Sequence, residues 1–331
     1  MTPEKLAEEL HTLATDHRRI RLGGNFSKDR LGGAVAGADV TISMAGMRRL
    51  LQYEPRDLTI SVEAGMRWSE LEQTLAENRQ ILPLDPGWPN STVGGVVAAN
   101  ISGPRRRLYG TARDMIIGMT FATLEGKLVQ SGGMVVKNVA GLDMAKLMVG
   151  SFGTLAAITV VNFKVFPMPL ESRTFEMRFA TAAEAFAERE RILRSVLQPA
   201  AIDILNWPEG FRMLVGAGGS PEVLDRYARE LPLARMVDES VWDEIRGFTP
   251  CFLEQHPAGG VVPLSVKPSE MCAAMQSLRV PAIARVGVIY AHYAENPPPI
   301  AWNGDFAMMK KVKHMFDPDR LLNPGRLYGR I

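Results

Sequence analysis

The first residues suited to chemistry form a glycine-rich loop close to the N-terminus. Residues 21–28 read Arg-Leu-Gly-Gly-Asn-Phe-Ser-Lys, and Gly32-Gly33 follow. Glycines tolerate positive φ and let backbone N–H groups converge on an anion, and Lys28 adds a point charge suited to phosphate. The loop matches neither GxGxxG nor GxxxxGK[ST], so the nicotinamide Rossmann and P-loop interpretations lack their usual support. Taken alone, the cluster fits a flexible surface turn equally well.

A second stretch, residues 86–103, carries a long track of small side chains. Ordinary core helices use large aliphatic residues to fill volume, so this track lets the backbone lie against something flat and bulky. The three arginines at 105–107 are most simply a solvated turn. Arg113-Asp114, just before a strand, indicates a structural ion pair or a buried cofactor contact. The small residues of the track are Thr92, Gly94, Gly95, Ala98, Ala99, Ser102 and Gly103.

A third glycine-rich region extends from Gly132-Gly133 through residues 137–143 to residues 150–155. Small polar residues again precede a strand. A single cluster of this kind indicates nothing specific. Three clusters within about 130 residues, each at a junction between elements, indicate a large phosphorylated ligand bound by backbone groups.

Length, composition and charge indicate the class of protein that carries these loops. Its 331 residues predict two domains, and 46% hydrophobic with 22% charged residues is typical of a globular protein. A formal net charge of +2 argues against a dedicated nucleic-acid binder. The N-terminus is charged throughout, with leucines at helical spacing, which predicts an amphipathic helix rather than a signal peptide. No apolar run reaches the length of a membrane span, so we expect a cytoplasmic protein, associated with membranes only through partners.

Periodicity and turn residues place the elements around the loops. The run at 156–166 alternates with a period of two, as a half-buried strand should. Ser69 is the expected N-cap of a helix over 68–78, and two prolines end a terminal helix over 302–316. The other expected elements are strands at 39–43, 57–63, 116–123 and 211–216, and helices at 181–197 and 221–231.

In this order the motifs resemble the vanillyl-alcohol-oxidase-type, or PCMH-type, FAD flavoproteins, and within them the FAD-binding E subunits of bacterial glycolate oxidases. The likeness is strong over residues 20–168, clear in the terminal FDPDRLLNPGRL and weaker between. It implies an α+β fold. A PCMH-type FAD-binding domain of two α+β subdomains would span 1–168, a smaller α+β cap 169–300, and a helix and tail returning to the first domain 301–331.

The resemblance also implies the FAD contacts. Relatives with covalent flavin carry a His or Cys in these loops. Here no His lies between His17 and His256, and Cys251 and Cys272 lie elsewhere, so noncovalent FAD is expected. The implied contacts are Gly23, Gly24, Asn25, Phe26, Ser27, Lys28, Pro86, Thr92, Val93, Gly94, Gly95, Ala99, Ser102, Gly103, Gly110, Arg113 and Asp114.

The cap departs from the catalytic relatives. Residues 290–297 correspond to their His-rich metal motif but keep one histidine and lack the Gly-Asp-Gly turn. We therefore expect no metal site, and the catalytic residues stay unassigned. The acid–base candidates are His292, Tyr290 and Lys267. A hydrogen-bonded structural role suits His292 better, and a solvated role suits Lys267 at least as well.

The resemblance implies an FAD-dependent oxidoreductase subunit of a glycolate (2-hydroxy-acid) oxidase complex that accepts electrons and relays them. Its implied partners are a catalytic sister flavoprotein and an Fe–S subunit, because two distant cysteines cannot hold a cluster. Two alternatives stay open: a non-catalytic assembly subunit that keeps its flavin, and a free-standing 2-hydroxy-acid dehydrogenase. The degraded metal motif disfavours the second.

Overall fold

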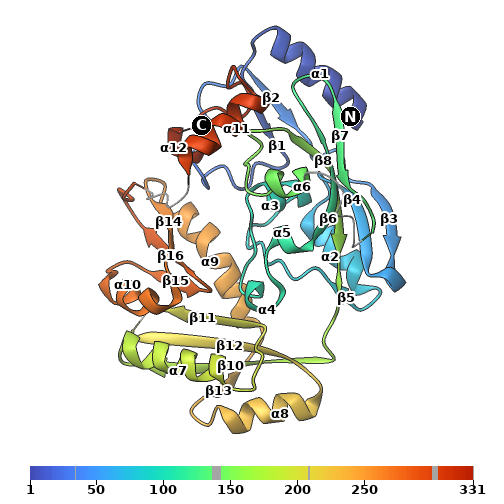
Figure 1. The fold of residues 1–331 in the computed structure, drawn as a ribbon. Helices are drawn as coiled ribbons and strands as arrows, with labels where there is room; N and C mark the ends of the chain where they lie inside the picture. Colours follow the sequence, from blue (N-terminus) through green and yellow to red (C-terminus); the bar gives the residue numbers. More distant parts are fainter. Residues whose placement is uncertain (34, 136–142, 208, 300–304, 331) are drawn as a thin grey trace. The chain divides into compact units, whose positions relative to one another are not determined.

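The computed structural model describes residues 1–331 except 34, 136–142, 208, 300–304 and 331 (Figure 1). The chain divides into two compact units. The first comprises Met1–Ile101, Thr111–Met168 and Gly304–Ile331, and the second Ser102–Gly110 and Pro169–Asn303. Helices and strands are mixed in both units, so the expected α+β class is confirmed. Compared with the expected domain boundaries, the main difference is residues 102–110, which cluster with the second unit.

A five-stranded antiparallel sheet forms the centre of the first unit, in the order β3-β4-β8-β6-β7. The predicted strands at 57–63, 116–123 and 156–166 are confirmed. The last, however, is not half-buried: six of its eight residues are buried, because it is the middle strand of the sheet and α3 packs on it. The bounds are β3 (Leu50–Glu54), β4 (Thr59–Glu63), β6 (Ile116–Ala122), β7 (Leu128–Gly132) and β8 (Ala157–Lys164).

A two-stranded parallel sheet in the same unit joins the two ends of the chain. It consists of β1 (Ile20–Gly23) and β2 (Val40–Ser43), and Ile20 forms a further parallel bridge with Leu322 of the C-terminal tail. The predicted N-terminal helix is confirmed as α1 (Pro3–Thr15). It buries its apolar side chains Leu6, Ala7 and Leu10 and packs on β6 and β7.

Short helices connect these strands. The predicted helix at 68–78 is confirmed as α2 (Trp68–Ala76), but Ser69 is not its N-cap. The helix begins at Trp68, so Ser69 is its second residue and the N-cap is Arg67, whose N–H is accepted by the Glu70 carboxylate at 3.4 Å. The other elements of the unit are β5 (Gln80–Ile81), α3 (Val93–Ala98), α5 (Ala112–Met115), α6 (Met144–Met148), β9 (Phe166–Pro167), α11 (Phe306–Phe316) and α12 (Arg326–Gly329).

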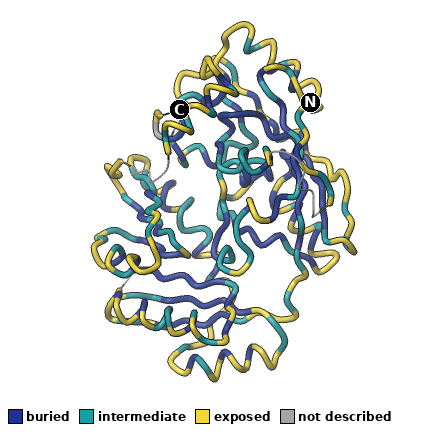
Figure 2. The backbone as a smooth tube through the Cα atoms, viewed as in Figure 1, coloured by how far each residue is buried: buried dark blue, intermediate teal, exposed yellow. Residues whose placement is uncertain are grey.

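The second unit is built on a seven-stranded antiparallel sheet in the order β13-β10-β12-β11-β15-β16-β14. Alternate side chains of its strands enter two separate apolar clusters, one with α7, α8 and α10 and one with α9. The sheet is therefore covered on both faces, and its central strands are drawn as buried in Figure 2. The predicted elements at 181–197, 211–216 and 221–231 are confirmed. The bounds are α4 (Arg106–Tyr109), β10 (Glu171–Phe179), α7 (Ala182–Arg194), β11 (Ala201–Leu205), β12 (Phe211–Gly219), α8 (Pro221–Glu230), β13 (Arg235–Val237), α9 (Val241–Gln255), β14 (Gly260–Ser265), α10 (Met271–Ser277), β15 (Ala282–Arg285) and β16 (Val288–Tyr293).

Candidate functional site

A pocket with about 710 Å³ of empty space, partly open to solvent, lies in the first unit. Its walls come from the loop after β1, from α3 and the turn before it, and from the segment leading into β8. Segments far apart in sequence therefore meet at one place. The predicted contacts that line the pocket are Gly23, Gly24, Asn25, Phe26, Ser27, Lys28, Thr92, Gly94, Gly95 and Ala99.

The loop after β1 presents its backbone to the pocket. Within the described part of the chain, the N–H groups of residues 24–28 have no protein acceptor. Phe26 has a φ of 54°, in the left-handed region, and the N–H of Asp29 closes the turn by donating to the Phe26 carbonyl at 3.2 Å. A left-handed residue in a turn points successive N–H groups to one side, which is the geometry of an anion-binding nest.

Lys28 is a buried cation in the wall of this pocket. Its side chain is 8% exposed. Its Nζ donates to Ser91 Oγ at 2.8 Å and to Ser27 Oγ at 3.3 Å, and it lies 5.9 Å from the Trp88 ring centroid. No carboxylate among the described residues pairs with it. Burial lowers the pKa of Lys28 to about 7, since an ammonium ion with only hydroxyl partners is costly to desolvate. The site therefore lacks an anion opposite Lys28.

Small residues let three segments approach one another around the pocket. A Cβ on Gly24 would lie 2.2 Å from Thr92 Oγ1, and a Cβ on Gly94 would lie 2.8 Å from the Cβ of Ala64. The missing side chains of these two glycines therefore make room for neighbouring protein segments, while both residues also line the pocket. Gly95 differs, because its nearest neighbours are Thr92 Oγ1 at 3.0 Å and Lys28 Nζ at 3.7 Å.

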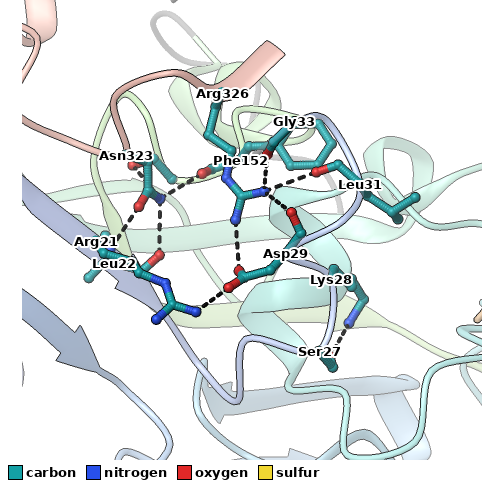
Figure 3. A network of polar contacts seen from close by, with 11 residues as sticks. Arg21, Leu22, Ser27, Lys28, Asp29, Leu31, Gly33, Phe152, Asn323 and Arg326 are labelled. Carbon is teal, nitrogen blue, oxygen red and sulfur yellow. Dashed lines mark hydrogen bonds and ion pairs between the residues drawn. The ribbon is translucent and has the colours of Figure 1, made fainter. Parts of the chain in front are cut away.

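The C-terminal tail ties the loop in place (Figure 3). Arg326 Nη1 donates to the carbonyls of Asp29, Leu31 and Gly33 at 2.8, 3.0 and 2.6 Å. Its Nη2 donates to Asp29 Oδ1 at 2.9 Å, and the same carboxylate also pairs with Arg21. Arg326 is buried and lines the pocket. The tail thus determines the path of the chain directly after the nest.

Asn323 joins the tail to two other segments of the site. Its Oδ1 accepts the Leu22 N–H at 2.7 Å, while its Nδ2 donates to the carbonyls of Leu22 and Phe152 at 3.0 and 2.8 Å. The residue is buried, with φ in the left-handed region that asparagine tolerates. One amide side chain therefore hydrogen-bonds the backbone of both strand β1 and the segment before β8.

We expect Asn323→Ala to lower the free energy of unfolding by about 2–4 kcal/mol, because it leaves the buried polar groups of Leu22 and Phe152 without partners. Urea unfolding of the FAD-free chain measures the loss. Gln73→Ala, at an exposed position of α2, is the control and should leave the midpoint unchanged. Equal midpoints for the two variants would contradict the bridging role of Asn323.

The structure does not bring all the predicted contacts to the pocket. The Val93 side chain is fully buried in the core. Arg113 and Asp114 do not pair with each other: Asp114 accepts the Thr111 N–H at 2.8 Å, and Arg113 donates to the Lys146 carbonyl at 3.2 Å. Residues 137–142 of the third motif lie outside the described residues. The predicted contacts that do not line the pocket are Pro86, Val93, Ser102, Gly103, Gly110, Arg113 and Asp114.

Sequence reasoning missed several wall residues. Arg326 gave no local signal, because its partners lie about 300 positions earlier in the chain. Ala64 precedes Gly65, where a Cβ would lie 1.9 Å from the Met44 carbonyl oxygen, so the Ala-Gly pair was a usable signal of close approach. The wall residues that were not assigned are Leu22, Asp29, Met44, Ala64, Ala98, Phe152, Gly153, Ala156, Ile158 and Arg326.

The acid–base candidates lie in the second unit. His292 is fully buried. Its Nε2 lies 2.9 Å from Thr249 Oγ1 and its Nδ1 lies 3.2 Å from the Pro281 carbonyl, so both ring nitrogens have partners. Burial lowers the pKa of His292 to about 4, and the ring packs edge-on against Phe248 and Phe252. This environment suits a neutral structural histidine.

The other two candidates are Lys267 and Tyr290. Lys267 is exposed and pairs with Glu270 at 3.6 Å, while the ring of Tyr290 lies 5.7 Å from the Arg285 guanidinium carbon. Within the described ranges, no group of three or more His, Cys, Asp or Glu side chains could hold a metal ion. No helix of the described residues has the length and apolarity to cross a membrane.

A backbone nest, an unpaired buried lysine and a floor of small residues form a site for a large ligand that carries a phosphate group. A family model described as "FAD binding domain" matches residues 1–132. The fold is that of alkyldihydroxyacetonephosphate synthase: its structures in two crystal forms give TM-scores of 0.74 and 0.76 at 19% and 18% identity, over 98% of this chain and 74% of that one. Fold and site together define a PCMH-type FAD-binding flavoprotein.

Similar proteins of known name identify the family of flavoproteins more closely. The chain is 30% identical to glycolate oxidase subunit GlcE of Escherichia coli (strain K12), over 99% of this chain and 98% of that one. It is 32% identical to a D-lactate dehydrogenase of Anaerostipes hadrus and 29% identical to glycolate oxidase subunit GlcD of Bacillus subtilis (strain 168), over 53% and 49% of this chain and 37% and 35% of theirs. The chain belongs to the family of PCMH-type FAD-binding proteins that includes GlcE.

Proposed function

We propose that this chain is an FAD-binding subunit of a glycolate (2-hydroxy-acid) oxidase complex. Similarity to GlcE over almost the full length of both chains supports the proposal. The observation that carries it is the buried Lys28, held beside the free N–H groups of residues 24–28 with no carboxylate partner in the described part of the chain. A dinucleotide pyrophosphate supplies the anion that this arrangement requires.

The residues divide the binding of FAD between them. The nest of residues 24–28 and the Lys28 ammonium would hold the pyrophosphate. Gly95 and Ala98 of α3 and the adjoining Ala99, whose side chains are small, leave room for the rest of the cofactor. Arg326 and Asn323 keep the loop in the binding conformation. Bound FAD supplies two-electron redox chemistry between a donor and an acceptor.

The side chains around the pocket support noncovalent binding of FAD. None of its described lining residues is a His or a Cys, the residue types expected to carry a covalent flavin. We expect acid precipitation of the purified yellow chain to leave all the flavin absorbance in the supernatant. Flavin that stays with the precipitated protein would disprove noncovalent binding.

We further propose that this chain relays electrons and that a sister flavoprotein oxidises the substrate. The packed, neutral His292 supports this division, because oxidation of a 2-hydroxy acid needs a base for the hydroxyl proton. An Fe–S partner would take electrons onward, since Cys251 and Cys272 are only two cysteines, too few for the four ligands of a cluster.

An assembly subunit that keeps FAD is the second candidate, because the cofactor pocket alone does not require electron transfer.

Anaerobic mixing distinguishes the candidates. We expect the FAD-loaded chain alone to show no flavin bleaching with glycolate or D-lactate, and bleaching once the partner subunits are present. Prompt bleaching of the chain alone, abolished in His292→Ala, would instead make it a self-sufficient dehydrogenase. Bleaching confined to the partner's flavin would favour the assembly role.

A further inference from the structure

A second pocket of the first unit is surrounded by basic side chains. It offers about 460 Å³ of empty space, open solvent included, at the end of α11 and shares no lining residue with the FAD pocket. Lys310, His314, Arg320 and Arg330 line it and are all exposed. The proposed function uses none of these four residues, so their clustering needs its own explanation.

The floor of this pocket is electrically neutral. Lys313, which is 3% exposed, donates from Nζ to Asp317 Oδ2 at 2.5 Å, to the Thr154 carbonyl at 2.7 Å and to the Leu322 carbonyl at 3.1 Å. The Asp317 carboxylate also accepts the N–H groups of Leu321 and Leu322, both at 2.8 Å. All three N–H bonds of the ammonium and both oxygens of the carboxylate are therefore engaged. The Asp317 carboxylate is therefore already paired and does not neutralise the exposed basic side chains of the pocket.

The exposed basic groups have no counter-charge in the described part of the chain. None of the four forms an ion pair there, and the neighbouring Asp319 lies instead 3.3 Å from His17 Nδ1. Lys310 and Arg330 both lie over the ring of Phe306, at 5.0 and 5.5 Å from its centroid. An aromatic ring attracts a cation but does not neutralise its charge, so both groups can still pair with an anion.

The helix dipole explains only part of the cluster. Basic residues in the last turn of a helix are stabilised by its carbonyl end, which accounts for Lys313 and His314 of α11. Arg320 and Arg330 lie beyond that helix. Arg320 has a φ of 56°, in the left-handed region that non-glycine residues seldom adopt, and the turn anchored by Asp317 holds it there.

We propose that this pocket binds a phosphate dianion, either inorganic phosphate or a phosphate monoester. Two guanidinium groups match phosphate oxygens by paired hydrogen bonds, and Lys310 adds a third permanent cation. The site is open to solvent through its exposed residues, so it takes a ligand from solution without displacing FAD.

The test uses the FAD-loaded full chain and calorimetric titration with sodium phosphate, with thermal unfolding as a second measurement. We expect saturable binding, an upward shift of the unfolding temperature and unchanged FAD content. Arg320→Gln and Arg330→Gln should each weaken phosphate binding at least tenfold. Lys311→Gln is the matched control, because Lys311 is an exposed neighbour on α11 that does not line the pocket.

Three outcomes would overturn the proposal. The first is equal stabilisation by sodium chloride at matched ionic strength, which indicates screening alone. The second is unchanged phosphate binding in the Arg320→Gln/Arg330→Gln double variant. The third is release of FAD by phosphate, which assigns the effect to the FAD pocket. With binding established, glycerol 3-phosphate identifies the source: affinity tenfold above that of inorganic phosphate indicates a monoester, and equal affinity indicates the free ion.

Discussion

Lys28→Met should weaken FAD binding by about 10- to 100-fold while making the FAD-free chain more stable. Hydrogen bonds to charged groups contribute about 1.5–3 kcal/mol, and the variant loses those between the ammonium and the pyrophosphate. In the FAD-free chain the same ammonium is buried beside hydroxyls only, so a methionine of similar length removes a desolvation cost. Binding and stability therefore change in opposite directions.

The lowered pKa of Lys28 makes both the stability of the FAD-free chain and its affinity for FAD depend on pH. Burial lowers the pKa of Lys28 to about 7 in the folded chain, against about 10.4 in an unfolded one. The buried Lys28 therefore does not lower the free energy of unfolding of the FAD-free chain above about pH 10.4. Its destabilising effect grows as the pH falls towards 7 and is constant below about pH 7. Bound pyrophosphate favours the protonated lysine, so FAD affinity should fall by up to tenfold for each pH unit above 7.

Fluorescence titration with FAD at pH 6, 7, 8 and 9, with urea unfolding of the FAD-free chain at the same pH values, checks both effects. Lys127→Met is the control, because this lysine is exposed and distant in sequence from the loop. An equal FAD affinity for Lys28→Met and the unaltered chain would show that Lys28 does not face the pyrophosphate.

Gly94→Val should abolish FAD binding and also destabilise the fold. Its Cβ would lie 2.8 Å from Ala64 Cβ and 3.1 Å from the Ala64 carbonyl oxygen, which already accepts the Gly94 N–H at 2.7 Å. The added side chain pushes α3 away from that segment. Overpacking of this kind costs about 1–3 kcal/mol, and it displaces the wall on which the cofactor is proposed to lie.

Gly95→Ala separates binding from folding. Its Cβ would lie 3.0 Å from Thr92 Oγ1 and 3.7 Å from Lys28 Nζ, so we expect a folded chain with weakened FAD binding. Gly46→Ala is the control, because nothing lies within 4 Å of its Cβ position. Flavin absorbance per chain and the urea midpoint are measured for all three variants. Stoichiometric FAD in a folded Gly94→Val variant would show that this stretch does not support the cofactor.

The glycine loop could be predicted from the sequence because its signal is local. Glycines, small polar residues and a lysine within eight positions fit a phosphate site or a surface turn, and the two further glycine-rich clusters favoured the phosphate site. In the structure the free backbone N–H groups belong to residues of this loop. The position of Val93 outside the pocket lining has a helical cause. In α3, Val93, Val96 and Val97 face the core, while Gly94, Gly95, Ala98 and Ala99 line the pocket. If the stretch is interpreted as a helix, the spacing of its valines and small residues predicts which side chains face the core and which face the pocket.

Other parts depend on contacts that no local pattern encodes. Arg326 and Asn323 act on residues about 300 positions away, and Met44 enters the pocket because β2 pairs with β1. The burial of β8 on both faces comes from its place in the middle of the sheet, which its alternating sequence does not reveal. The neutral state of His292 likewise depends on packing by Phe248 and Phe252.

The pairing of Leu22 with Asn323 also sets an order of events during synthesis. The two residues are 301 positions apart, so β1 can pair with β2, and Lys28 with Ser91, well before Asn323 is available. Contacts of such long range form slowly, because a large loop must close before they contribute any stability. We therefore expect much of the five-stranded sheet to form before Asn323 and Arg326 are synthesised, and β1 and the loop after it to gain their bonds to these two residues only later.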